Sequence, residues 1–155
     1  MKRTLGLTLL LFATLFSCMR QEKPLPAELS RAESVMWEHP DSALSILRSM
    51  PQSSLSSGKN YATWALLLAQ ARDKVYGKRL PDSLNIPFSD KLVQDAMDYF
   101  EKEGNLKRMA QTYYYKGQLL KDQKKITEAM PFFLKSKEMM TKLDEPLFTY
   151  LICQS

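Results

Sequence analysis

The sequence predicts an all-α domain, and three observations lead to this class. The chain has 155 residues, 45% of them hydrophobic and 25% charged, which is typical of one folded domain and not of a disordered chain. It contains only 5 glycines and is rich in unbranched side chains, which lose little rotamer freedom in a helix. Its apolar residues recur at spacings of three and four, the period of an amphipathic helix.

Residues 1–17 have the layout of a signal peptide. Lys2 and Arg3 form a short positive region, and an apolar run over 5–16 follows them. As a helix this run would be about 18 Å long, against roughly 30 Å for the hydrocarbon core of a membrane. We therefore expect a targeting segment that is removed from the mature protein, and not a membrane-spanning helix.

Residues 15–18, Leu-Phe-Ser-Cys, resemble the lipobox of bacterial lipoproteins, although Phe16 stands where a small or β-branched residue is usual. The resemblance implies that Cys18 is lipidated and becomes the first mature residue, and roughly two or three acyl chains would then hold the protein at a membrane. An ordinary secretory leader with an incidental cysteine is the alternative. Residues 18–26, polar and punctuated by prolines, are expected to form a tether.

Proline, glycine and polar loops divide the rest of the chain into helical segments. The apolar stripes predict helices over 27–38, 43–50, 59–76, 90–103, 106–123 and 128–143, and one more segment that opens at 144–146 and stops at Ser155.

The boundaries of these helices carry recognisable capping residues. The expected N-caps are residues whose side-chain oxygen can accept a hydrogen bond from the first turn: Asp41 with Ser42, Ser89, and Thr127. Gly104 suits the left-handed position that ends a helix. Pro131 is expected in the first turn of its helix, where the missing N–H costs least.

Residues 110–143 resemble a tetratricopeptide repeat, a helix pair of about 34 residues. The resemblance rests on Tyr113, Gly117, Ala129 and Phe133. It implies that Gly117 and Ala129 face each other where the two helices cross, and that Tyr113 and Phe133 fill the space beside them. Looser copies precede this repeat, so the resemblance implies a solenoid of about three helix pairs within a domain over 27–155.

The lipobox and the repeats together resemble the N-terminal part of tetratricopeptide lipoproteins of Bacteroidetes. Lys116, at a position where leucine is usual, departs from the pattern. Such solenoids use the concave side, lined by the first helix of each pair, as a working surface. In the best repeat these positions are Gln111, Tyr114, Gln118 and Lys121. A row of small residues at Ala62, Ala65 and Ala69 in the preceding pair suggests instead that a neighbouring helix packs closely there.

No set of residues in the sequence predicts catalysis, a metal site or a bound cofactor. His39, the single histidine, precedes Pro40 and is interpreted as part of a turn that ends a helix. The formal net charge of +5 is small and scattered, which excludes nucleic acid as an expected partner. Cys18 and Cys153 are the only cysteines, and no disulfide is predicted.

The expected protein is a non-enzymatic lipoprotein that acts as a scaffold or adaptor at a bacterial envelope membrane, most simply the outer membrane. Its partner is an unidentified protein or peptide, and no small-molecule substrate is expected. The alternative is a shortened N-terminal sensory segment of a longer tetratricopeptide signalling or transcription-regulatory protein, because the chain stops within an expected helix.

Overall fold

The computed structural model describes residues 24–76 and 89–143, and within these ranges the protein is all-α, without a strand. The predicted all-α class is confirmed. The elements in chain order are α2 (Ala27–Val35), α3 (Pro40–Ser49), the 3-10 helix η1 (Gln52–Leu55), α4 (Gly58–Tyr76), α5 (Asp90–Glu103), α6 (Leu106–Asp122) and α7 (Ile126–Lys142).

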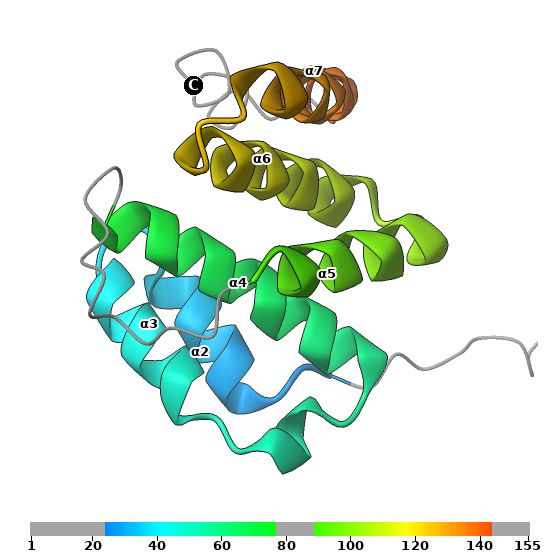
Figure 1. The fold of residues 1–155 in the computed structure, drawn as a ribbon. Coiled ribbons are helices and arrows are strands. Elements are labelled where there is room, and N and C mark those ends of the chain that lie inside the picture. The colour runs from blue at the N-terminus through cyan, green and yellow to red at the C-terminus, as the bar shows by residue number, and fades with distance from the viewer. Residues whose placement is uncertain (1–23, 77–88, 144–155) are drawn as a thin grey trace, which may run out of the picture.

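The helices pack largely in the order of the chain. Figure 1 shows α5, α6 and α7 stacked one above the other, with α2, α3 and α4 gathered at the other end of the stack. Each helix contacts the next one in sequence, and α4 also contacts α2 and α6. The Arg108 guanidinium lies 2.8 Å from the Glu33 carboxylate, so α6 is joined directly to α2 as well.

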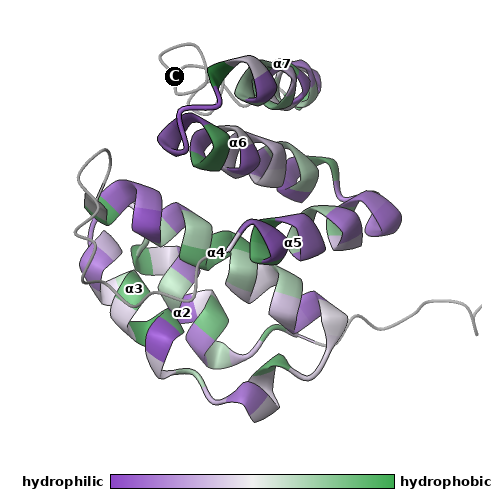
Figure 2. Cartoon of the chain, in the orientation of Figure 1, coloured by the Kyte–Doolittle hydropathy of each residue, from purple (hydrophilic) through white to green (hydrophobic). Residues whose placement is uncertain are grey.

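The core is centred on α4, in which every residue from 62 to 71 is buried. A helix that is covered on all sides needs small or apolar residues around its whole circumference. The row Ala62, Ala65 and Ala69 supplies small ones and is almost completely buried, as the sequence suggested. Figure 2 shows the contrast with α5, whose outward side is largely hydrophilic.

Two predicted helix ends are confirmed by their geometry. The Ser89 hydroxyl accepts a hydrogen bond from the Leu92 N–H at 3.2 Å and so caps α5. Gly104 adopts a left-handed conformation with φ of 74° and ends the same helix. Ser89 satisfies a backbone N–H at the start of α5, and the Gly104 N–H satisfies backbone carbonyls at its end.

Two other predicted N-caps are wrong. α3 begins at Pro40, so Asp41 and Ser42 lie inside its first turn. Proline is suited to this first position because its φ is already helical and its missing N–H has no intrahelical partner there. The earlier helix ends at Val35, ahead of the His39 turn that was expected to end it.

The α6–α7 turn is tighter than predicted, and it moves the start of α7. Lys124 has φ of 63°, and the Lys125 N–H donates to the Leu120 carbonyl at 2.9 Å. This closure of a helix C-terminus by a left-handed residue leaves no room for a longer loop. α7 therefore begins at Ile126, Thr127 lies inside it without a capping role, and Pro131 lies in the second turn and not the first.

Two segments predicted as irregular chain are partly built into the fold. Residues 52–55, predicted as a loop, form η1 and bury Leu55. Leu25, predicted as tether, is half-buried and packs against the core. Burial of these two side chains keeps apolar surface from water, which favours order over a free loop.

Candidate functional site

Several predicted features lie outside the described residues. These are Cys18, the signal peptide over 1–17, most of the tether and the last helical segment over 144–155. None of the helices in the described ranges combines the length and the apolar character that a membrane crossing requires.

The four predicted partner-binding residues lie in a row on α6, but two of them have little surface left for a partner. Gln111 and Tyr114 are only 6% and 5% exposed, and Gln118 and Lys121 are half-buried. The Gln118 amide donates a hydrogen bond to the Tyr114 hydroxyl at 2.8 Å. This row is therefore a covered surface and not an open groove.

The packing between α6 and α7 is centred on Gly117 and Phe133. A Cβ atom on Gly117 would lie 2.6 Å from the Phe133 ring, so the ring occupies the space that a larger residue would need. The closest neighbours of Gly117 thus belong to Phe133 and not, as expected, to Ala129, although Ala129 is also buried. The Tyr113 ring packs beside Phe132, with ring centroids 6.0 Å apart.

Polar side chains of α6 link it to α5. The Lys116 ammonium, buried at a position where leucine is usual, lies 2.5 Å from the Asp90 carboxylate at the start of α5. The Tyr113 hydroxyl donates to the Glu101 carboxylate. Burial, this hydrogen bond and the nearby negative charge raise the pKa of Tyr113 to about 12. Lys116 and Tyr113 therefore hold α6 against α5.

Charged residues gather where α4 and α6 end. Arg72 of α4 lies 3.4 Å from Asp122 of α6. Burial, with a smaller contribution from the Asp122 charge, raises the pKa of the neighbouring Asp73 carboxyl, and Lys74 and Arg72 oppose the shift. The folded protein consequently holds a carboxylate whose ionisation is unfavourable.

We expect Asp73→Asn to increase the free energy of unfolding near neutral pH. A folded-state pKa above the unfolded one means that the folded protein binds this proton more tightly, so ionisation costs stability as the pH rises between the two values. The increase in the free energy of unfolding should be largest near neutral pH. It should vanish in acid, where Asp73 is protonated in both the folded and the unfolded protein.

Urea unfolding at a series of pH values measures this difference. Asp98→Asn, on the exposed side of α5, is the control and should change little at any pH. A stability gain for Asp73→Asn that did not depend on pH would contradict the raised pKa of Asp73.

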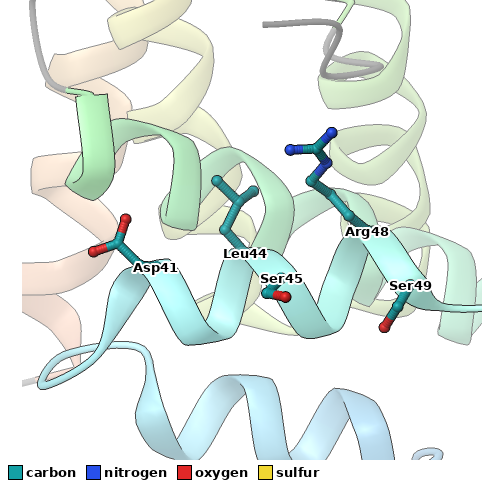
Figure 3. A pocket seen from close by; sticks show the side chains of 5 residues that line it. All are labelled: Asp41, Leu44, Ser45, Arg48 and Ser49. Atoms are coloured by element: carbon teal, nitrogen blue, oxygen red, sulfur yellow. The ribbon is translucent and has the colours of Figure 1, made fainter.

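A depression of about 440 Å³ lies along α3 and is lined by one face of that helix. Figure 3 shows the five labelled side chains along two turns, from Asp41 at one end to Arg48 and Ser49 at the other. Leu44 supplies the apolar part, and Asp41 and Arg48 supply opposite charges. Asp41 was predicted only as an N-cap and the other four residues carry no motif, although their spacing places all five on one face of a helix.

An apolar stripe is exposed along α7. Ile126, Met130 and Leu134 recur every fourth residue and are 53%, 51% and 60% exposed. Elsewhere on the described surface Trp37 is 45% exposed, and the Lys74 ammonium lies 3.3 Å from the centre of its ring. Such a stripe suits contact with another protein better than contact with a small polar ligand.

Comparison with protein-family models, with curated proteins and with solved structures finds no match to this chain. Within the described ranges no three histidine, cysteine or carboxylate side chains are grouped so that they could hold a metal ion.

Proposed function

We propose that this protein is a non-enzymatic lipoprotein scaffold, held at a bacterial envelope membrane through Cys18, that binds a protein or peptide with tetratricopeptide-like helix pairs. The outer membrane is the proposed location. The lipobox-like residues 15–18 support the anchor.

The observation that carries the proposal is the α6–α7 pair. Residues 110–143 place a glycine, Gly117, against an aromatic ring of the second helix, and the Ser136 hydroxyl donates to the Ala110 carbonyl at 2.6 Å. Close approach of two helices through small residues at these positions is what the sequence resemblance implies. The contacts of α4 with α2 and with α6 support a stack of such pairs, because each first helix then touches the next.

The way the buried polar side chains are used supports binding over catalysis. Lys116 is paired with Asp90, Tyr113 with Glu101, and Ser136 with a backbone carbonyl. A catalytic group needs access to a reacting atom in a cleft, whereas these buried groups are each engaged by a partner on a neighbouring helix.

Removal of the cysteine tests the anchor. We expect Cys18→Ala to move the protein from the membrane fraction to the soluble fraction almost completely, because each buried CH₂ of a lost acyl chain contributes about 0.8 kcal/mol to membrane binding. Fractionation and immunoblotting measure the distribution, and density centrifugation separates the two envelope membranes. Cys153→Ala is the matched control and should stay with the membrane. Retention of Cys18→Ala in the membrane would exclude the anchor.

The scaffold role is tested on the same membranes by chemical cross-linking of the anchored protein. We expect one protein to be cross-linked to the wild type and to be lost from the Leu134→Lys variant, which changes the α7 stripe. This result would support binding through the helix stack. Equal capture by both forms contradicts a role for this stripe.

A further inference from the structure

The depression on α3 carries two opposite charges on one line of the helix, as Figure 3 shows. Arg48 follows Asp41 by nearly two helical turns, so at about 100° per residue the two side chains leave the helix in almost the same direction. At 1.5 Å per residue their Cα atoms lie about 10 Å apart along the axis. The helix dipole favours an acid in the first turn and a base in the last, but it does not require that both lie on one face.

Both charges are exposed and have no partner among the described residues. In that part of the chain the Asp41 carboxylate and the Arg48 guanidinium form no hydrogen bond and no ion pair, and the Ser45 hydroxyl between them forms no hydrogen bond. A separation of about 10 Å is too large for the two charges to pair with each other. In contrast, Arg108 and Lys116 are paired with carboxylates at the contacts between helices. The polar groups of the depression are therefore available to a ligand.

The apolar part of the depression lies between the two charges. Leu44 is three residues after Asp41 and four before Arg48, so it shares their face of α3. Its side chain is only 4% exposed and forms a floor beneath the charged groups. The depression measures about 440 Å³, within the range of small-ligand sites. Along α3 a ligand would thus meet an anion, an apolar floor and a cation, in that order.

We infer that this depression binds a short peptide with free ends, about three residues long, whose ammonium lies at Asp41 and whose carboxylate lies at Arg48. An extended chain spans at most about 3.3–3.6 Å per residue, so a tripeptide covers about 10 Å, the separation of the two charges. A single amino acid is too short to reach both, and an internal segment of a protein lacks the free ends. An arginine holds a carboxylate through two parallel hydrogen bonds, and an aspartate accepts hydrogen bonds from an ammonium.

This site is separate from the α7 stripe and from the lipid anchor, so the inference goes beyond the proposed function. An apolar middle residue of the peptide would lie over Leu44, and the Ser45 hydroxyl is placed to bond with the peptide backbone. Because the charges of the site are exposed, each contact contributes little, and we expect a dissociation constant of roughly 1 mM.

A titration followed by nuclear magnetic resonance tests the inference. The probe is alanyl-leucyl-alanine, added to the isotope-labelled full chain carrying Cys18→Ser, which cannot be lipidated. The amide signals of α3, Pro40–Ser49, should shift saturably. Acetylation of the peptide's amino end or amidation of its carboxyl end should each weaken binding about fivefold, the effect of one exposed ion pair at the upper end of its usual range.

Variants of the two charged residues show which end of the peptide each one holds. Asp41→Asn should weaken binding of the free tripeptide about fivefold and leave the affinity for the acetylated peptide unchanged, because the contact is already lost. Arg48→Gln should behave in the same way towards the amidated peptide. Asp98→Asn on α5 and Arg31→Gln on α2, also at exposed positions, are the matched controls and should change neither affinity. Circular dichroism checks that the variants keep their helix content.

Four results would each overturn the inference. These are shifts that do not saturate, shifts centred on another helix, equal affinity for free and blocked peptides, and equal weakening of the free and acetylated peptides by Asp41→Asn. Leu134→Lys, which tests the scaffold, should leave tripeptide binding unchanged, so failure of the scaffold and failure of this site are distinguishable.

Discussion

Phe133→Ala should lower the free energy of unfolding by about 3–5 kcal/mol, the usual cost of removing a buried phenylalanine. The Phe133 side chain is only 8% exposed and fills the space that Gly117 leaves open. Truncation removes the contact with the Tyr114 ring, 5.9 Å away between centroids, and leaves a cavity between α6 and α7 that two rigid helices cannot close.

The neighbouring residue provides the control for this prediction. Leu134 is 60% exposed, so Leu134→Ala should change the stability by no more than about 0.5 kcal/mol. Adding Gly117→Ala to Phe133→Ala should recover part of the loss, because the new methyl group enters the cavity and alanine favours the helix by about 1 kcal/mol over glycine. Urea unfolding of the four proteins measures these values. Equal losses for the two single truncations would contradict the packing described for α7.

Trp64→Ala should cost a similar amount, about 3–5 kcal/mol, and Trp64→Phe about 1–3 kcal/mol. The buried Trp64 indole N–H donates to the Leu47 carbonyl at 2.8 Å. In a regular helix that carbonyl would accept from the N–H four residues later, but this residue is Pro51, which has none. The indole therefore satisfies a buried carbonyl that the α3 backbone cannot satisfy. Phenylalanine would keep most of the packing and leave the carbonyl without its donor.

Trp37 is the matched control because it is the other tryptophan and is 45% exposed. Trp37→Phe keeps a ring beside the Lys74 ammonium and should change the stability by no more than about 0.5 kcal/mol. Chemical unfolding followed by circular dichroism compares the variants without relying on tryptophan fluorescence. If Trp64→Phe were as stable as the wild type, the hydrogen bond to α3 would contribute nothing.

The helices themselves could be predicted because their evidence is local. Apolar spacing located all six described helices, and the ends at Ser89 and Gly104 followed from chemistry within one turn. The starts of α3 and α7 were misplaced, since a helix can begin at a proline, or two residues after a left-handed lysine, without the usual capping oxygen. Local rules overestimate the need for a cap where the preceding turn already fixes the backbone.

The candidate site could be predicted only in part, because its contacts join residues far apart in the sequence. Lys116 stood out as a departure from the repeat pattern, but its partner Asp90 precedes it by 26 residues, and the depth of its burial depends on how α5 crosses α6. Tyr114 was placed correctly on a helix face, yet whether that face is open depends on what lies over it. Helix periodicity gives the direction of a side chain and not the identity of its neighbour.

The ion pair between Arg108 and Glu33 has a consequence for how the protein unfolds. In a linear array each repeat touches only its neighbours, so the ends can fray while the middle stays folded. Here a side chain of α6 reaches α2 across 75 residues of sequence. Separation of α2 from α6 must break this link, which couples the N-terminal helices to α6 and favours one cooperative transition over stepwise loss of helices.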